Sequence, residues 1–400
     1  MTCSPRPGKG LYITTAEALG DLCRRLRQAD RLALDTEFVS EQTYVPQLGL
    51  IQVAGNGLLA MVDPLAVPSL DPLIELLRDP TLEKVVHAGR QELEIFCAYG
   101  YGLPQPIFDV QIAAAFLGYG DQVSYASLVQ ELIGHRLQKK ETFTDWLQRP
   151  LRRAQVEYAL EDVEYLLPVA EKLREQLVAR GRLGWAQEEF AKLVAQVRWP
   201  RVEAGQEYQL VAGWSRLDRR SLAVLRELAA WREREAQQRN WPRRRVLSDT
   251  LLLELARRHP THPRDLRDIR ALPRRIVEKS ASEVIMAIQR GLQTPDSDLP
   301  RRPRKPPSGP SQAAVADLLA ALIKMRALEM GIAPRLLATQ QDLEDLIQQF
   351  HNGQEASLPL FQGWRGEAVG ADLLAFLNGA TALRLNPATG QVRTESAGEG

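Results

Sequence analysis

The sequence predicts an α/β domain followed by two all-α helical domains. In the first 200 residues, short apolar runs alternate with amphipathic helical patterns, as in a mixed sheet flanked by helices. After Gly213 the patterns are helical, and a proline-rich stretch divides them. The length of 400 residues leaves room for about two to four domains.

Strands are expected at 31–36 and 48–53, which are short and apolar, and in the runs LLAMVDP and KVVHA. Helices are expected between and after them, in DPLIELLRD, RQELEIFCAYG, DVQIAAAFLG and the long segment that begins AQVEYALEDVEYLLP. No convincing strand follows Gly213. These patterns divide the chain into segments with expected bounds 1–200, 210–293, 294–311, 312–380 and 381–400. The third segment is a linker, because the stretch 293–312 contains six prolines, and the fifth is a flexible tail.

The charges are balanced overall but not by region. Lys and Arg total 51 against 50 Asp and Glu, for a net charge of +1. Residues 1–200 carry a net −5, residues 201–300 a net +6, and residues 301–400 none. The total excludes a histone-like polycation and a wholly acidic disordered chain. The basic region remains a candidate for binding nucleic acid.

The three cysteines form no CxxC pair, which indicates a reducing compartment and argues against structural zinc. The N-terminus lacks the apolar run of a secretory signal. No apolar run approaches the ~18–20 residues of a membrane span. We therefore expect a cytoplasmic protein that does not associate with membranes.

Two acidic side chains in LALDTEF indicate a cation site. Asp35 and Glu37 are two residues apart on a predicted strand, so both point to the same side. Two adjacent carboxylates repel each other unless a cation neutralises them, and Mg²⁺ or Mn²⁺ prefers such oxygen ligands. The alternative is a strand end at which one carboxylate is merely solvated.

Two further segments carry candidate residues. Tyr158 and Asp162 are four residues apart and share one face of a predicted helix; alternatively, Asp162 belongs to a solvated acidic face and Tyr158 is half-buried. Glu92 falls in the first turns of the helix expected after KVVHA. Alternatively, its only role there is a favourable interaction with the helix dipole.

Taken in order, the segments DTEF, QLGLIQVA, HAGxxxLExF, LPQPxxDxQIAAxFLG, TDWLxRPL and YAxxDVxYLLP resemble the ribonuclease D family. This family belongs to the tyrosine subclass of the DEDD superfamily of 3′→5′ exonucleases. The resemblance covers about residues 32–175 almost continuously. It implies a ribonuclease-H-like sheet with the acidic residues clustered at one edge.

The resemblance implies a catalytic set of Asp35, Glu37, Glu92, Tyr158 and Asp162. The four acids would hold two divalent cations, Mg²⁺ or Mn²⁺, which stabilise the attacking and leaving oxygens of a phosphodiester. Asp35 would bridge the ions, and Tyr158 would orient the attacking water. The family usually has Asp where this chain has Glu92. The extra methylene puts the geometry of the second ion in question, since Mg²⁺ is strict about its ligands.

Four residues near this set are candidates for contact with the nucleic acid. Phe38 is a possible stacking surface for the terminal base, although core packing explains it equally well. His87 is interpreted as an accessory or structural residue rather than a metal ligand. Lys139 and Lys140 could touch backbone phosphate or simply be solvated.

The basic segment 213–292, with 19 basic and 10 acidic residues, resembles an HRDC domain in REREAQQRNWPRRRVLSDTLLLELARRHP. Its candidate RNA-binding residues are Trp241, Arg243, Arg244 and Arg245. Alternatively, Trp241 packs in the core and the arginines only solubilise a helix end. Residues 312–380 resemble a second, more diverged HRDC-like module. Our hypothesis is that this module packs against the catalytic domain.

The resemblance implies a 3′→5′ exoribonuclease that releases nucleoside 5′-monophosphates. Its expected substrates are RNAs with a single-stranded 3′ end, such as tRNA precursors and other structured RNAs, and it is expected to be a monomer. One alternative is an exonuclease acting on single-stranded DNA. Another is an RNA-binding protein whose activity is impaired by Glu92.

Overall fold

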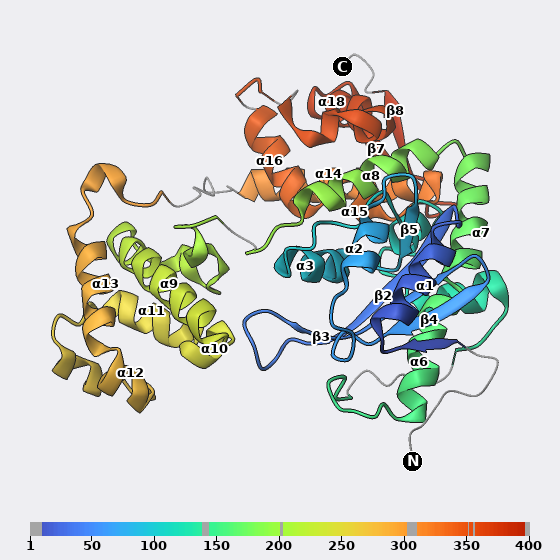
Figure 1. The fold of residues 1–400 in the computed structure, drawn as a ribbon. Helices are drawn as coiled ribbons and strands as arrows, with labels where there is room; N and C mark the ends of the chain where they lie inside the picture. Colours follow the sequence, from blue (N-terminus) through green and yellow to red (C-terminus); the bar gives the residue numbers. More distant parts are fainter. Residues whose placement is uncertain are drawn as a thin grey trace.

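The computed structural model describes residues 10–137, 144–200, 203–301, 310–350, 352–354 and 357–396. These residues form an α/β domain, a separate helical domain and a C-terminal helical region (Figure 1). The α/β class of the first part and the mainly helical character of the rest are confirmed. None of the helices in the described part of the chain has the length and apolar character that crossing a lipid bilayer requires.

The α/β domain is built on a six-stranded mixed sheet with strand order β1-β4-β3-β2-β5-β6. Its central strand β2 pairs antiparallel with β3 and parallel with β5. The four predicted strands are present, as β2 to β5. Two three-residue strands, β1 and β6, were not predicted, because so short a segment shows no periodicity. The strands are β1 Leu11–Ile13, β2 Arg31–Val39, β3 Gln47–Gly55, β4 Leu58–Val62, β5 Glu83–Val86 and β6 Ile107–Asp109.

Helices cover both faces of this sheet. Apolar side chains of α1, α2 and α3 pack against one face, in a core with Leu32 and Leu34 of β2. On the other face, α6 packs on Leu50 of β3 and Met61 of β4, and α7 contacts β2 and β5. The helices are α1 Ala16–Leu26, α2 Asp71–Arg78, α3 Arg90–Ala98, α4 Val110–Ala115, α5 Tyr125–Leu128, α6 Arg153–Glu164, α7 Leu166–Ala179 and α8 Leu183–Gln196.

The helical domain has a hydrophobic core of its own. Its longest helices, α9 and α13, lie against each other, and Gly291 permits the close approach. A Cβ atom at this position would lie 2.7 Å from the backbone nitrogen of Val224, a distance that real Cβ atoms essentially never show. The helices are α9 Arg219–Arg239, α10 Arg243–Val246, α11 Asp249–Arg258, α12 Arg274–Lys279 and α13 Ala281–Gln293.

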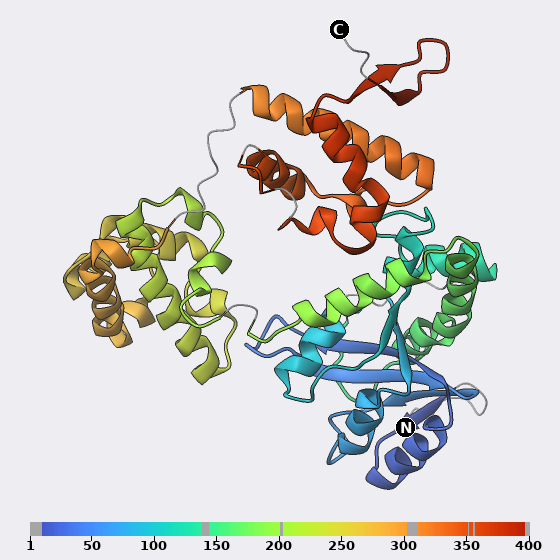
Figure 2. The ribbon, with the colours of Figure 1, turned by 90° about the horizontal axis from the view of Figure 1, so that it is seen from above.

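The C-terminal region packs against the α/β domain, as hypothesised (Figure 2). Its buried side chains join those of α4, α7 and α8 in one continuous core. The Trp364 ring is stacked on Trp185 with centroids 5.3 Å apart, and Arg365 forms a 2.7 Å ion pair with Glu189. The helices here are α14 Pro310–Met330, α15 Pro334–Leu337, α16 Gln340–Phe350, α17 Gly363–Arg365 and α18 Ala371–Leu377.

The expectation of no strand after Gly213 is wrong. Strands β7 (Thr381–Leu385) and β8 (Val392–Ser396) form an antiparallel hairpin in the segment expected to be a flexible tail. Its turn is closed by Asn386, whose side-chain oxygen accepts a 2.9 Å hydrogen bond from the Ala388 amide. Both strands are largely exposed, so their sequence lacks the apolar alternation that reveals a half-buried strand. Most of the expected linker, residues 302–309, lies outside the described residues.

Candidate active site

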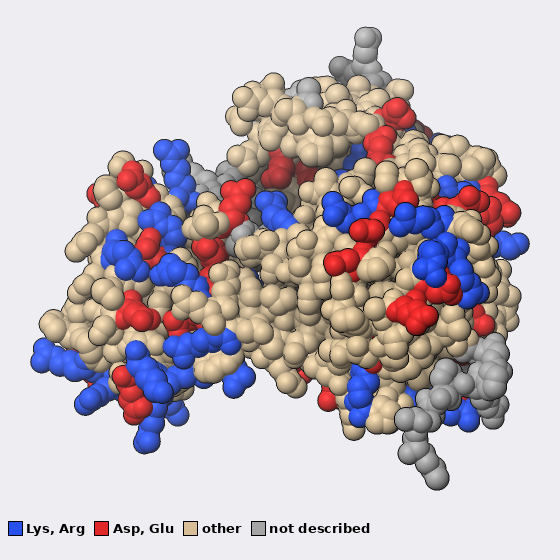
Figure 3. Space-filling view, in the orientation of Figure 1, with Lys and Arg blue, Asp and Glu red and all other residues tan. Residues whose placement is uncertain are grey.

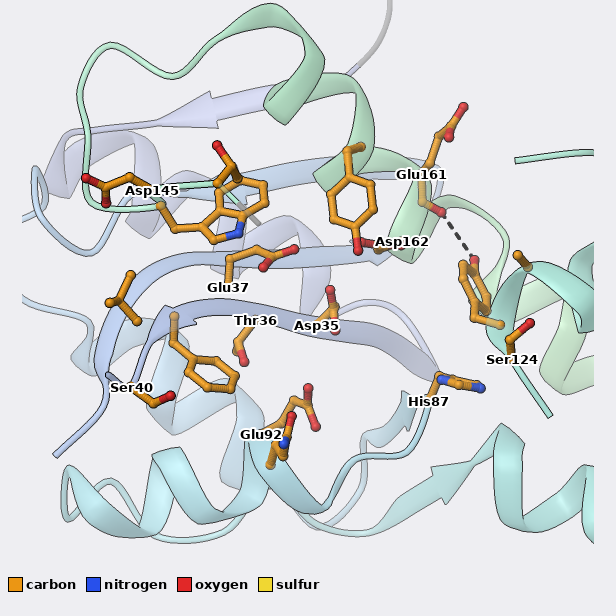
Figure 4. A pocket seen from close by; sticks show the side chains of 18 of the residues that line it. Asp35, Thr36, Glu37, Ser40, His87, Glu92, Ser124, Asp145, Glu161 and Asp162 are labelled. Atoms are coloured by element: carbon orange, nitrogen blue, oxygen red, sulfur yellow. Dashed lines mark hydrogen bonds between the residues drawn. The ribbon is translucent and has the colours of Figure 1, made fainter. Parts of the chain in front are cut away.

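Three carboxylates meet on the α6 face of the sheet. Asp35 and Glu37 alternate with Thr36 on β2, so both point toward α6, which carries Asp162 (Figure 4). One carboxylate oxygen from each of Asp35, Glu37 and Asp162 lies within 4.8 Å of the others. The two-residue spacing thus places the first two acids as predicted, and α6 brings the third to them.

Glu92 approaches from the opposite side. It lies in the first turn of α3, and Figure 4 shows it across β2 from Glu37. The three-residue cluster within 4.8 Å does not include it. Its side chain is only 8% exposed, and its Oε2 atom has no hydrogen-bond partner among the described residues. Such a buried, unpartnered carboxylate oxygen is costly unless another group or an ion satisfies it.

The crowding shifts the ionisation of the acids. Burial raises the pKa of Asp35 to about 7. Burial, followed by repulsion from Asp35, Asp162 and Glu92, raises the pKa of Glu37 to about 9. Burial and the charge of Asp35 also raise the pKa of Glu92 well above its usual value. The oxygen donors, their mutual repulsion and the unpartnered Oε2 all fit a site for divalent cations.

Tyr158 lies one helical turn before Asp162 and forms a hydrogen bond with it. Burial, followed by the charge of Asp162, raises the pKa of the phenol, which is therefore neutral near pH 7. The buried Trp146 ring lies 6.1 Å from the Tyr158 ring. Only a glycine fits at position 49 under this tryptophan, since a Cβ atom there would lie 2.7 Å from the Trp146 carbonyl oxygen. No local pattern in the sequence indicates this supporting position of Trp146.

Asp109 and His87 form hydrogen bonds with the backbone of segments next to the acidic residues. The Asp109 side chain caps α4, accepting hydrogen bonds from the amides of Gln111 and Ile112. It also accepts a 2.9 Å hydrogen bond from the amide of Gly89, which stabilises the turn before α3, the helix that carries Glu92. That second role carried no sequence signal. His87 Nε2 donates to the Val123 carbonyl oxygen over 3.0 Å, so this histidine holds a neighbouring loop.

The acids line a cavity of about 710 Å³. Phe38 lines this cavity and also packs partly against the core beneath β2. Lys139 and Lys140 lie outside the described residues. A second cavity, of about 700 Å³, is lined by the α/β domain and by Arg243, Arg244 and Arg245 of the helical domain. The two cavities share a rim made of Phe38, Ser40, Glu41 and Gln91.

The three predicted RNA-binding arginines differ in whether they form an ion pair. Arg243 forms an ion pair with Glu233, with nitrogen-to-oxygen distances of 2.5 and 2.7 Å, so a carboxylate already compensates its charge. Arg244 and Arg245 form no ion pair within the described residues. Basic side chains gather on the outer surface of this domain (Figure 3).

Trp241 is half-buried, and three guanidinium groups surround its ring. Those of Arg239, Arg245 and Arg275 lie 5.4, 4.5 and 5.2 Å from the ring centroid. This distance range is typical of cation–π contacts. Neither Arg239 nor Arg275 was among the predicted RNA-binding residues. Only the fold could reveal Arg275, because α12 brings it to the tryptophan from more than 30 residues away.

Comparison with protein families defines the class. A profile described as 3′-5′ exonuclease matches residues 11–178, and an HRDC domain profile matches residues 221–288. These ranges cover the sheet with its acidic cluster and the separate helical domain. The protein is therefore a 3′–5′ exonuclease with an HRDC domain.

Full-length relatives define the family. The chain is 41% identical over 381 residues to ribonuclease D of Granulibacter bethesdensis, covering 93% of both chains. It is 42% identical over 383 residues to ribonuclease D of Gluconacetobacter diazotrophicus, covering 93% of this chain and 94% of the relative. The chain belongs to the ribonuclease D family, and as a member of it the protein is a 3′–5′ exoribonuclease.

Solved structures agree with this placement. The crystal structure of Escherichia coli RNase D, described as an exoribonuclease involved in structured RNA processing, superposes with a TM-score of 0.82 at 34% identity. The match covers 92% of this chain and 98% of that one. A protein from Bifidobacterium adolescentis matches with a TM-score of 0.71 at 25% identity, covering 94% and 98%.

Proposed function

We propose that the protein removes nucleotides from RNA 3′ ends by metal-dependent hydrolysis and releases nucleoside 5′-monophosphates. Its proposed substrates are tRNA precursors and other structured RNAs with a single-stranded 3′ end. The observation that carries the proposal is the convergence of Asp35, Glu37 and Asp162 within 4.8 Å, with Glu92 unpartnered beside them, in one cavity. So many acids in one place are stable only with protons or cations bound.

In this proposal Asp35, Glu37, Glu92 and Asp162 hold two divalent cations, Mg²⁺ or Mn²⁺. Such ions supply positive charge to the attacking and leaving oxygens of the phosphodiester. Tyr158 remains a neutral phenol because its pKa is raised, so it orients the attacking water through a hydrogen bond and does not remove its proton. Glu92 would reach the second cation from the far side of β2, opposite Glu37.

The shared rim of the two cavities indicates the path of the RNA. The terminal nucleotide would lie in the first cavity against Phe38, and the preceding nucleotides would cross Ser40 and Glu41 toward Arg244 and Arg245. Contacts between these arginines and phosphates would make binding weaken as salt concentration rises. The guanidinium groups around Trp241 extend the same positive surface.

A strand-shortening assay tests the proposal. A 5′-labelled RNA hairpin with a free 3′ overhang should shorten stepwise in Mg²⁺ or Mn²⁺ and remain intact in EDTA. Asp35→Asn should lose at least about a hundredfold in rate. Glu157→Gln, which changes an acid on α6 that is paired with Arg153 at the surface, should remain active. Equal rates for the wild type and Asp35→Asn would disprove the proposal.

Two further assays distinguish the proposed function from a DNA exonuclease and from an RNA-binding protein with an impaired site. A DNA oligomer of matched sequence should be hydrolysed more slowly than the RNA; faster hydrolysis of the DNA would favour a DNA exonuclease. Glu92→Asp restores the side chain usual in the family. If the wild type were inactive and Glu92→Asp active, the native protein would be an RNA-binding protein with an impaired site.

A further inference from the structure

A loop of the α/β domain is held by the helical domain. Tyr44 lies between β2 and β3, and its hydroxyl donates a hydrogen bond to Glu233 of α9. The same hydroxyl accepts a 3.1 Å hydrogen bond from the Gln237 side chain. The side-chain oxygen of Asn240 accepts from the backbone amides of Tyr44, at 3.1 Å, and Val45, at 3.4 Å. A single loop residue thus contacts three positions along the end of α9.

Arg243 completes this contact. Its guanidinium lies 5.1 Å from the centre of the Tyr44 ring and is bidentate to Glu233, which is 5% exposed. The Trp199 ring meets Tyr44 edge-on at 5.8 Å. Although burial opposes it, hydrogen bonds from Arg243 and Tyr44 lower the pKa of Glu233. The ion pair is therefore formed at neutral pH. We call Tyr44, Glu233, Asn240 and Arg243 the Tyr44 clasp.

The clasp is attached to the catalytic strand. The loop that it holds begins directly after β2, which carries Asp35 and Glu37. Ser40 and Glu41 in this loop are exposed, and both belong to the rim shared by the two cavities. On the other side, Arg243 belongs to α10 together with Arg244 and Arg245. The clasp therefore joins the rim of the active-site cavity to the arginines of the helical domain.

We propose that the Tyr44 clasp aligns the helical domain with the active site and so determines how well the enzyme binds RNA longer than a few nucleotides. Tyr44 is a positioning residue, because it acts through the loop and through Arg243 and lies outside the acidic cluster. This inference rests on the proposed function for its substrate. Chemistry on the terminal nucleotide does not need the clasp, since the acids are held by β2, α3 and α6.

The test compares kcat and KM for a dinucleotide and for a 12-nucleotide RNA. Tyr44→Ala should raise KM for the longer RNA about tenfold, as expected if one or two phosphate contacts lose their alignment. Its kcat, and both constants for the dinucleotide, should stay within about twofold of the wild type. Tyr44→Phe keeps the ring under Arg243 and should recover part of the loss. Tyr119→Phe removes a hydroxyl that bonds Gln176 inside the α/β domain and should have no effect.

Small-angle scattering provides a readout that is independent of activity. Tyr44→Ala should widen the distribution of interatomic distances, and Tyr119→Phe should not. The proposal would be overturned if Tyr44→Ala lost activity equally on both RNAs, or if it changed neither the scattering nor the KM for the longer RNA. If the wild type hydrolysed neither substrate, the proposed function would fail, and the scattering would still decide whether the clasp holds the domains. If Tyr44→Ala did not fold, Glu233→Gln and Tyr44→Phe would take its place in both measurements.

Discussion

Glu37 should destabilise the protein when no metal is bound. Burial and the neighbouring acids raise its pKa from 4.5 to about 9. Between these values the folded protein retains a proton that the unfolded chain releases, so stability falls as the pH rises through this window. Glutamine cannot ionise and escapes this penalty. Glu37→Gln is therefore expected to stabilise the metal-free protein at neutral and alkaline pH while it impairs activity.

The magnitude follows from the pKa. One pKa unit corresponds to about 1.4 kcal/mol, so the penalty at pH 7 reaches at most roughly 3 kcal/mol. Because Glu37 is only partly buried, water reduces this to about 2 kcal/mol. For a domain of about 150–250 residues, 1 kcal/mol shifts the melting temperature by roughly 2–4 °C. We expect Glu37→Gln to melt about 4–8 °C higher than the wild type in EDTA.

Thermal unfolding at pH 5, 6, 7 and 8 measures this effect. The gain should be near zero at pH 5 and greatest at pH 8, and Mn²⁺ should stabilise the wild type more than the variant. Glu157→Gln, which loses only an exposed pair with Arg153, should change the free energy of unfolding by no more than about 0.5 kcal/mol. A variant less stable than the wild type at pH 8, or an equal gain at pH 5 and pH 8, would show that Glu37 carries no such penalty.

Three other substitutions test the scaffold. Arg149→Ala removes the bidentate partner of Asp63, which is 2% exposed, and should cost about 3 kcal/mol in urea unfolding at pH 7. Although burial raises the pKa of Asp63, hydrogen bonds from Arg149 and Tyr12, together with the Arg149 charge, lower it overall, so that cost should shrink as the pH falls below about 4. Gly291→Ala would press a Cβ atom against Val224 and should destabilise the helical domain by about 1–3 kcal/mol, lowering its melting temperature while Mn²⁺ still stabilises the α/β domain. Trp364→Ala, at a position 1% exposed, should cost about 3–5 kcal/mol and speed limited proteolysis of the C-terminal region.

Local spacing explains what could be predicted from the sequence. Two-residue spacing on a strand places Asp35 and Glu37 on one face, and four-residue spacing on a helix places Tyr158 beside Asp162. Buried strands were recognisable from apolar runs of four or more residues. Periodicity could not reveal β1 and β6, which have three residues each, or the exposed hairpin of β7 and β8.

Long-range pairing explains what could not be predicted. Arg243 looked like a phosphate contact because it stands in a run of three arginines, but its partners are Glu233 and Tyr44, and Tyr44 lies 199 residues away in the sequence. Local spacing could not show that Glu92 lies across β2 from Glu37, because that placement depends on how α3 packs. The hydrogen bond between Asp109 and the Gly89 amide likewise depends on the pairing of β5 with β6.

The proposed chemistry requires that four carboxylates form one site for divalent cations. Crystals soaked in Mn²⁺ and a nucleoside monophosphate test it most directly, through the anomalous scattering of manganese. We expect two manganese ions, one among Asp35, Glu37 and Asp162 and one between Asp35 and Glu92. No manganese at these carboxylates, or manganese bound only elsewhere on the protein, would contradict it.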